Sequence, residues 1–408
     1  MAPQLPRLLA SVTPSQLTNK ACLPPNLPAT QGNYTFNVGA IPPKAYEVCT
    51  PSEGKSFKLT VDAADKWAAL TFINTGGFEI LKASIDSHKM YVYAVDGQYI
   101  TPQAVDTIVV NNGERYQVLI KLDQEQGEYA IRVANSGLNQ IISGYGVLSY
   151  KGSTGPSSTA TASIAVNGGN TTATVKAFND TAAAPYPPNQ PAPTADATFK
   201  FLIKKMAQPY GAWQWTLSGV SPYNQSNEDA TPLLLQDPAT VPATDLVIKT
   251  KNGDWVDLIV QVAGPVAQPH PMHKHSNKAF VIGGGVGTFN YSSVQEAQAA
   301  GVRFNLVNPP YRDGYTTTPA EGNSSWLAIR YQVLNPGAFL FHCHMQTHLT
   351  GGMAIAMLDG VDAWPSVPPE YTVGGNGIVV KGKKQKQKNK NNSKSKVHKI
   401  REFLGLGM

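Results

Sequence analysis

Short apolar stretches separated by turn residues run along most of the chain, and this spacing is the strongest constraint on its fold. Segments such as Trp67–Ile73, Met90–Val95 and Tyr116–Lys121 are rich in β-branched and aromatic residues, and they end at turns such as Asp96–Gly97 and Asn111–Gly113. This pattern is typical of β-sandwiches. A charged content of only 15%, with 36 Gly and 31 Pro, excludes a coiled coil and a disordered chain. We therefore expect an all-β fold.

The strand pattern divides the chain into two β-rich parts. Residues 31–150 and 198–365 each predict one Greek-key β-sandwich, whereas residues 151–197 are rich in Ser, Thr, Ala and Pro and predict a flexible linker or a surface excursion. Residues 1–30 are Pro-rich and irregular, and residues 366–408 lead into a basic tail. The expected elements are the strands Ser56–Val61, Trp67–Ile73, Ala83–Ile85, Met90–Val95, Thr107–Val110, Tyr116–Lys121, Tyr129–Val133, Gly146–Tyr150, Phe199–Ile203, Leu246–Lys249, Trp255–Val262, Ala279–Val281, Trp326–Val333 and Gly352–Leu358, and the helix Ser293–Ala300.

The net charge of +6 belongs to the carboxy-terminal tail. Residues 371–408 hold nine Lys, one Arg and one Glu, so the remaining residues carry a net charge of −3. The tail has no interleaved aromatic residues, and we interpret it as a disordered solvated segment, or as sequence beyond a misassigned exon boundary, rather than as a nucleic-acid site. No apolar run approaches the roughly 18 residues of a membrane span, so none is expected.

Signals for the cellular compartment conflict. The first residues, Met1–Ser15, contain only Leu8–Ala10 as an apolar core and do not form a recognisable signal peptide. Cys22 and Cys49 can form a local disulfide in an oxidising compartment or remain reduced. The N-x-S/T sequons indicate a secreted protein and begin at Asn33, Asn170, Asn179, Asn224, Asn290, Asn323 and Asn391.

Most of the histidines lie in two clusters that follow the period of a β-strand. Side chains alternate between the two faces of a strand, so the clusters separate into two sets. The first set, the four-imidazole face, consists of His273, His275, His342 and His344. The second set, the three-donor group, consists of His270 and Cys343, which have the opposite parity, and His348, which is reachable from the following loop.

Each set has a matching metal chemistry. Two imidazoles, one thiolate and a weak thioether from Met353 make a mononuclear blue-copper site. The four-imidazole face suits further copper ions that bind and reduce O2, and Cys343 lies between His342 and His344 in the chain, which gives a short covalent route for electrons. Zinc is the main alternative, because it also binds His and Cys, but it leaves Met353 and the separation of the two sets unexplained.

At these residues the sequence resembles a known family. Residues 270–280 (H-P-M-H-K-H-S-N-K-A-F) and 342–353 (H-C-H-M-Q-T-H-L-T-G-G-M) resemble the carboxy-terminal copper motifs of multicopper oxidases. The flanking residues 307–313 and 358–365 are similar to the fungal laccase-like branch associated with conidial pigment, as are Ser84–His88 and Glu114–Tyr116 of the part that matches the family's middle domain. The resemblance covers roughly residues 20–370.

The resemblance implies two cupredoxin-like domains and oxidation of phenols, or sometimes of metal ions, by four coppers that reduce O2 to water. It implies that His270, Cys343 and His348 bind the type 1 copper with Met353 axial. It further implies a type 2 ligand, His273, and type 3 ligands, His275, His342 and His344. The axial thioether favours a low-potential oxidant. Glu79 is a candidate for binding the phenol, the alternative being an ordinary surface carboxylate. The family implies a secreted, cell-wall or vacuolar location.

The sequence also departs from the family. Its members have three cupredoxin domains, and their trinuclear cluster uses eight histidines, half of them from two further H-x-H motifs that this sequence lacks. His88 and His398 are isolated, and we expect them to be structural. We therefore expect a chain without the first domain, with a complete type 1 site and half of the cluster ligands, so that oxidase activity is impaired. The alternatives are a type 1 electron-transfer or copper-binding module, a ferroxidase, and a product without either activity. The oligomeric state stays open.

Overall fold

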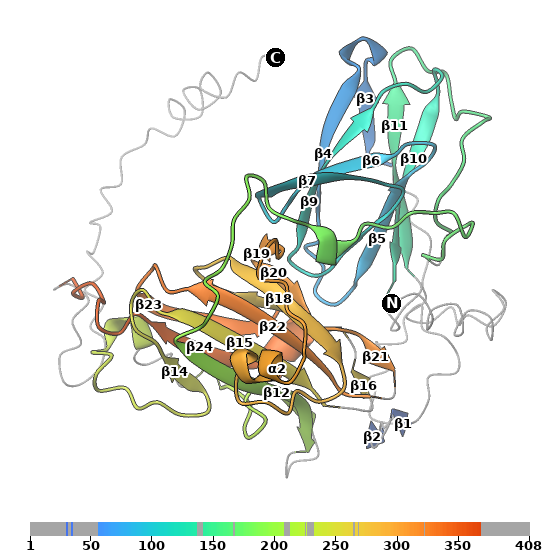
Figure 1. Ribbon diagram of the computed structural model, residues 1–408. Coiled ribbons are helices and arrows are strands. Elements are labelled where there is room, and N and C mark those ends of the chain that lie inside the picture. Colours follow the sequence, from blue (N-terminus) through green and yellow to red (C-terminus); the bar gives the residue numbers. More distant parts are fainter. Residues whose placement is uncertain are drawn as a thin grey trace, which may run out of the picture.

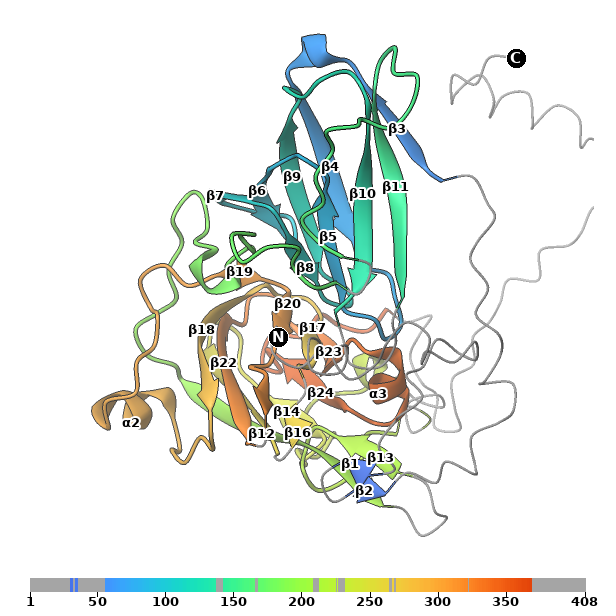
Figure 2. The same cartoon turned by 90° about the vertical axis from the view of Figure 1, so that its right-hand side faces the viewer.

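The computed structural model describes residues 56–368, apart from 137–141, 166–167, 208–212, 225, 227–231, 264–265, 268 and 322, and the backbone of strands β1 (Thr30–Gln31) and β2 (Tyr34–Thr35). The described residues form two β-sandwiches, one above the other in Figure 1 and in the rotated view of Figure 2. The expectation of an all-β fold is confirmed. Cys22, Cys49, His398 and the basic tail lie outside the described residues.

The first sandwich packs a five-stranded sheet, in the order β3-β11-β10-β5-β8, against a four-stranded sheet, β4-β9-β6-β7. Its strands alternate buried and less buried residues, so that Val118 and Ile120 of β9 meet Ile85 of β5 in the core. The strands are β3 (Lys58–Val61), β4 (Trp67–Ile73), β5 (Leu81–Ile85), β6 (Met90–Val95), β7 (Gln98–Val105), β8 (Ile108–Val110), β9 (Arg115–Lys121), β10 (Glu128–Asn135) and β11 (Ser143–Tyr150).

The second sandwich packs a six-stranded sheet, β13-β12-β15-β22-β18-β19, against a five-stranded sheet, β14-β24-β23-β17-β20. Val260 of β15 and Ile355 of β24 meet in its core. Strands β16 and β21 pair separately. The strands are β12 (Ala197–Ala207), β13 (Trp213–Thr216), β14 (Val247–Lys249), β15 (Trp255–Val262), β16 (Val266–Ala267), β17 (Pro271–Lys274), β18 (Ala279–Val286), β19 (Tyr311–Arg312), β20 (Gly314–Thr316), β21 (Ala320–Glu321), β22 (Ser325–Gln332), β23 (Gly337–Cys343) and β24 (Ala354–Asp359).

Helices are short in the described part of the chain. Helix α2 (Val294–Ala299) occupies the segment where a helix is expected; the Ser293 side chain caps it by accepting from the Glu296 amide. Its buried face packs on the outer side of the six-stranded sheet. The other helices are α3 (Gln346–Thr350) and the single 3-10 turns η4 (Ala63–Asp65), η5 (Asp180–Ala182) and η7 (Leu233–Leu235). No helix among the described residues is both long enough and apolar enough to cross a membrane.

Segment 151–197 runs between the sandwiches and lies partly against the first one. Phe178 and Ala183 are buried in the core of the first sandwich, and the amide of Phe178 donates to the carbonyl of Thr107. Next to them, the carboxylate of Asp180 accepts from the guanidinium of Arg312 in the second sandwich. The part of the segment around η5 is therefore a packed connection.

Loops of the first sandwich pack on the second. Ile80 is buried in the core of the second sandwich, and Phe78 packs against that core. The amide of Gln346, at the start of α3, donates to the carbonyl of Gly77 at 2.8 Å. The two sandwiches therefore meet at the part of the second sandwich that carries the two histidine clusters.

Candidate metal centre

Strands β17 and β23 bring the two histidine clusters together. The strands are antiparallel neighbours, and Met272 lies opposite Cys343 while His273 lies opposite His342. Directly opposite residues share a face of the sheet. The pair Met272 and Cys343 therefore faces the core of the second sandwich, and the imidazole pair faces away from it.

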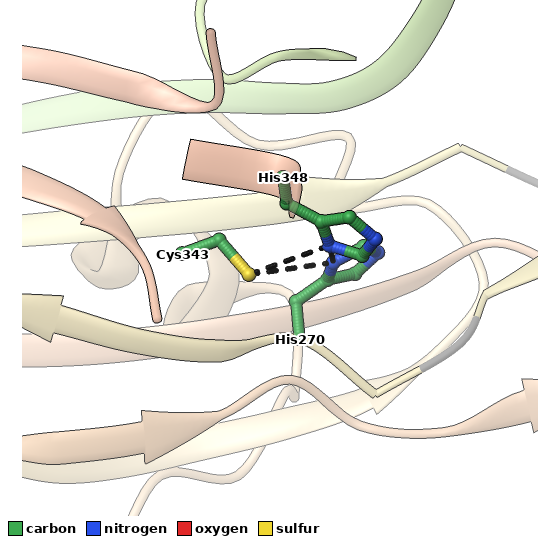
Figure 3. A group of neighbouring side chains, drawn as sticks. All are labelled: His270, Cys343 and His348. Atoms are coloured by element: carbon green, nitrogen blue, oxygen red, sulfur yellow. Dashed lines mark hydrogen bonds between the residues drawn. The ribbon is translucent and has the colours of Figure 1, made fainter. Parts of the chain in front are cut away.

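The three-donor group converges on one buried point (Figure 3). Cys343 Sγ lies 3.8 Å from His270 Nδ1 and 3.5 Å from His348 Nδ1, and the two Nδ1 atoms are 3.2 Å apart. His270 precedes β17, Cys343 ends β23, and His348 lies in α3. These ligand atoms all lie within 4.8 Å of one another, and the three residues are buried.

Burial keeps both imidazoles of this group neutral and its thiol protonated in the metal-free chain. It lowers the pKa of His270 to about 3 and that of His348 to about 2, and it raises the pKa of Cys343 to about 12. Neutral imidazoles are ready to bind a metal. The thiol ionises only when a cation supplies the opposite charge, so the site is organised for metal binding rather than for acid–base chemistry.

Met353 is hydrogen-bonded through its backbone to two of these three residues. Its amide donates to the His348 carbonyl at 3.0 Å, its carbonyl accepts from the Cys343 amide at 3.1 Å, and its side chain is fully buried. The sharp turn between His348 and Met353 is closed by Gly352, whose φ of +102° favours glycine. The thioether is thus carried by a backbone that is hydrogen-bonded to two of the three donor residues.

The donor set fits copper. Metal–ligand bonds of about 2.0–2.3 Å in a trigonal arrangement place the donors roughly 3.5–4 Å apart, close to the separations within the three-donor group. A structural zinc site uses four strong ligands, whereas the metal group among the described residues has three, and its neighbour Met353 offers a weak thioether. Two imidazoles, a thiolate and a weak axial group make a blue-copper site.

The four-imidazole face gathers on the other side of the same strands. The centroids of neighbouring rings lie 5.2 to 6.0 Å apart. His342 is buried, and His273 is half-buried, but His275 and His344 are exposed. The three-donor group is therefore closed, and the four-imidazole face is open to further ligands.

Backbone carbonyls orient two rings of this face. His273 Nδ1 lies 2.7 Å from the Asp313 carbonyl oxygen, and His342 Nδ1 lies 2.9 Å from the carbonyl oxygen of Cys343. A carbonyl oxygen only accepts, so each Nδ1 donates, and in the neutral ring each Nε2 keeps its lone pair. His342 Nε2 is also 3.2 Å from His275 Nε2, which places two potential metal-ligand atoms side by side.

Two aromatic rings cover the three-donor group, and the sequence pattern pointed to neither. The Trp215 ring of β13 lies 4.3 Å from the His348 ring and 5.3 Å from the His270 ring, between centroids. Phe78, from the first sandwich, lies edge-on to His348 at 5.9 Å. Both rings are half-buried. The sequence holds no spacing that connects either ring to the histidine clusters, because both arrive through tertiary packing.

The remaining candidate residues, Glu79 and His88, belong to neither histidine set. Glu79 is half-buried in the loop after β4, next to Phe78, and its Oε2 lies 3.1 Å from the position that a Cβ on Gly76 would take. His88 is buried in the first sandwich, with Nδ1 2.7 Å from the Asp86 carbonyl oxygen and Nε2 2.9 Å from the Tyr150 hydroxyl. His88 is therefore a packed and hydrogen-bonded histidine.

Comparison with known proteins identifies the family. Residues 10–153 and 212–363 match two sequence profiles described as multicopper oxidase. The chain is 47% identical to the multicopper oxidase elcG of Phaeosphaeria nodorum over 89% of its length and 59% of that protein's. It is 42% identical to the laccase abr2 of Aspergillus fumigatus over 86% and 60% of the two chains. The chain thus spans about three fifths of these curated relatives.

Solved structures agree on the fold. The laccase from Botrytis aclada superposes with a TM-score of 0.62 at 22% identity, over 81% of this chain and 57% of the laccase. Fet3p, a multicopper oxidase that functions in iron import, superposes with a TM-score of 0.61 at 17% identity, over 75% and 58%. The expected cupredoxin-like fold and the resemblance are confirmed: the chain belongs to the multicopper oxidase family.

Proposed function

We propose that this protein is a copper-dependent oxidase that removes one electron at a time from phenolic substrates and couples this oxidation to the reduction of O2. One observation carries the proposal. The buried thiol of Cys343 belongs to the three-donor group, while the residues on either side of it in the chain belong to the four-imidazole face. An electron-accepting site and an O2-reducing site are then joined through a single residue.

The ligand roles follow from the two sets. We assign His270, Cys343 and His348 to a type 1 copper with Met353 axial. We assign His273 to a type 2 copper, and His275, His342 and His344 to type 3 coppers. The second assignment is supported by the orientation of the rings, because two of the four imidazoles donate from Nδ1 to carbonyls and present Nε2.

Bound copper would supply the one-electron redox chemistry, and the residues of the chain do the rest. The closed packing around the three-donor group excludes water, since all three residues are buried. His342 is held by the Cys343 carbonyl, so the imidazole on the proposed electron route is fixed relative to Cys343. The route from the Cys343 side chain through the backbone to the imidazole of His342 or His344 is entirely covalent.

A phenol would approach the three-donor group from the side of the half-buried rings of Trp215 and Phe78. The imidazoles of His270 and His348 are buried, whereas Trp215 and Phe78 are half-buried and touch the His348 ring. An aromatic substrate that stacks on these rings would come close to a metal ligand without displacing it. Glu79 is adjacent to Phe78 in the chain, and its carboxylate is our candidate for accepting a hydrogen bond from the phenolic hydroxyl.

Copper loading tests the proposed function. The full chain is loaded with copper, and its copper content, blue absorption and O2 uptake with a simple phenol are compared with those of a Cys343→Ser variant. Blue absorption that is lost in C343S, together with several coppers per chain and O2 uptake, is the expected result. A single blue copper without O2 uptake contradicts the oxidase proposal and supports the second candidate, a type 1 electron-transfer module, which the closed three-donor group and the exposed His275 and His344 favour.

We also propose that the protein is secreted or resides in the cell wall or vacuole. The seven sequons support this location, and the described residues Asn170, Asn179 and Asn290 are exposed. A glycosidase-sensitive mobility shift of the protein isolated from its native cells is expected. An unshifted protein recovered from the cytosolic fraction would contradict the proposed location.

A further inference from the structure

A single guanidinium of the first sandwich reaches two backbone segments that touch the four-imidazole face. Arg115, the first residue of β9, donates from Nη1 to Asp313 Oδ1 at 2.5 Å and from Nη2 to Asp313 Oδ2 at 2.9 Å. Its Nη1 also lies 3.3 Å from the carbonyl oxygen of Gly113. The two-pronged contact with the carboxylate fixes the direction as well as the distance of the pair.

The first of these segments orients His273. Asp313 lies between β19 and β20, and the next residue, Gly314, is the register partner of His273. While the Asp313 carboxylate binds Arg115, its carbonyl oxygen accepts from His273 Nδ1 at 2.7 Å. Arg115 thus acts on the imidazole through one residue, and the contact fixes the tautomer that leaves Nε2 with its lone pair.

The second segment forms a wall against His344. Gly113 has a φ of +82°, and a Cβ at this position would lie 2.6 Å from the His344 ring. The Gly113 amide donates to the Asn74 carbonyl at 3.0 Å, and its carbonyl faces Arg115. The peptide on each side of Gly113 is therefore held, so the backbone that limits the position of His344 is fixed from the first sandwich.

From this geometry we propose that Arg115 is a positioning residue that orients His273 and His344 for metal binding. The proposal rests on the proposed function in one respect, namely that the four-imidazole face holds copper. Arg115 touches neither imidazole directly. The docking of the two sandwiches has other supports, since Arg312 pairs with Asp96 and Glu114, and Ile80 is buried in the second core. Loss of the Arg115 side chain is therefore expected to change the rings more than the docking.

The chain contains a matched control for this arrangement. Arg132 binds both carboxylate oxygens of Asp86, at 2.7 and 2.8 Å, and the Asp86 carbonyl oxygen lies 2.7 Å from His88 Nδ1. The Arg132 and Arg115 side chains have similar exposure, 35% and 33%. The same arginine–aspartate–histidine arrangement therefore occurs inside the first sandwich, away from both histidine sets.

The first test needs no metal. Histidine ring nitrogens of the copper-free chain are observed by nitrogen-15 NMR after selective labelling, and the His273 signals are assigned with a His273→Gln variant. Arg115→Met is expected to convert the fixed Nδ1–H form of His273 into a mixture of tautomers, while the His88 and His270 signals stay in place. Arg132→Met is expected to leave His273 at its wild-type position. A His273 signal that is the same in R115M and in wild type would overturn the proposal.

An Arg115→Lys variant covers the case in which R115M does not fold. Lysine keeps the charge, but its ammonium cannot reproduce the planar two-pronged contact of the guanidinium with the carboxylate. Its His273 signals are expected to lie between those of wild type and a tautomer mixture. Wild-type His273 signals in R115K would overturn the requirement for the guanidinium.

Copper titration then separates the proposal from the proposed function. Binding of copper beyond the blue site is expected to weaken about 10- to 100-fold in R115M, as for other residues that orient metal ligands, with blue absorption unchanged. R132M is expected to match wild type. If wild type binds no copper at the four-imidazole face, the assignment of that face in the proposed function fails, while the tautomer measurement still decides whether Arg115 orients His273. An equal copper affinity in R115M and wild type would count against the proposal.

Discussion

At Cys343 the alternation of a β-strand places neighbouring residues in two different kinds of candidate metal site. Its side chain is fully buried in the second core, while the rings of His342 and His344, on either side of it, lie 5.7 Å apart on the opposite face. Successive side chains along a strand point to opposite faces of the sheet. A shift of this strand by one residue would place the thiol among the four imidazoles and remove both sets at once.

The Met353 thioether is expected to set the redox potential of the type 1 copper and to have little effect on the free energy of unfolding. Met353→Leu removes the thioether but nearly conserves volume, so the cost in unfolding free energy stays below about 1.5 kcal/mol. A weaker axial contact makes type 1 copper a stronger oxidant, and redox titration of the blue band should therefore give a higher potential in M353L. Met357→Leu, at a fully buried core position of β24, is the control. Equal potentials in M353L and M357L would rule out an axial role.

The pH dependence of stability is expected to reflect the raised pKa of the Glu114 carboxyl. Burial raises the pKa of this carboxyl to about 7, against the pull of Arg312 and with the repulsion of Asp180 and Asp96. Between about pH 4.5 and 7 the folded chain keeps a proton that the unfolded chain releases, so this contribution to stability is full below pH 4.5 and is lost as the pH rises through 7. Glutamine cannot lose the proton. The unfolding free energy of E114Q relative to wild type should therefore increase by up to roughly 3 kcal/mol from pH 4.5 to pH 8.

Denaturant unfolding of the two proteins at each pH measures this difference directly. Shared titrations cancel between wild type and E114Q, so only the group that was replaced contributes to the slope. A difference between the two proteins that stays constant from pH 4.5 to pH 8 would show that the pKa of Glu114 is not raised in the folded chain.

The sequence indicates the donor residues because their spacing is local, whereas their supporting residues come from elsewhere in the chain. In each H-x-H pair, the period of a strand predicts that both imidazoles lie on the same face of the sheet. Arg115 and Asp313 are 198 residues apart, and neither carries a pattern that names the other. Trp215 reaches His348 because β12 and β13 fold back over α3, where the Trp215 amide donates to the Gly351 carbonyl. Such contacts exist only once the sheets are packed.

At the scale of elements, strand alternation predicts many of the strands but not all of them. Expected strands such as Trp67–Ile73 and Trp255–Val262 coincide with β4 and β15. Strand β7 was not expected because Pro102 and polar residues interrupt it, and the structure places it at the edge of its sheet, where proline is tolerated. Helix α3 is only five residues long, too short for helical periodicity, although it carries His348.

Strand β17 is expected to depend on a buried ion pair on the face opposite the His273 imidazole. Lys274 Nζ lies 2.6 Å from Asp359 Oδ2, both side chains are fully buried, and Asp359 Oδ1 accepts from the hydroxyls of Tyr331 and Thr250. Lys274→Met leaves a buried carboxylate without its cation and should cost about 3–5 kcal/mol in chemical denaturation. The double variant K274M/D359N should recover much of this loss, because the amide is neutral and still accepts both hydroxyls. A double variant no more stable than K274M would exclude charge burial as the cause.

At the scale of the whole molecule, the two sandwiches are joined by charges that the sequence keeps far apart. Arg312 Nε lies 2.9 Å from Asp96 Oδ2, a contact between residues separated by 216 positions, and the same guanidinium reaches Glu114 and Asp180. Two β-rich parts are evident from the strand pattern, but the pattern contains no information about how they dock. Docking determines the site, because the wall against His344 belongs to the other sandwich.

Loss of Arg312 is expected to uncouple the two sandwiches. Arg312→Met leaves the buried Asp96 carboxylate, beside Glu114, without its cation, and the cost of about 3–5 kcal/mol falls on the contact between the sandwiches. Differential scanning calorimetry of R312M should then show two separate transitions in place of one. Arg330→Met is the matched control, since Arg330 forms an equally buried pair with Asp257 inside the second sandwich. R330M should lower the transition temperature without splitting the transition. If R312M also unfolds in one transition, the charged cluster does not couple the sandwiches, and their apolar contacts through Phe78 and Ile80 must hold them together.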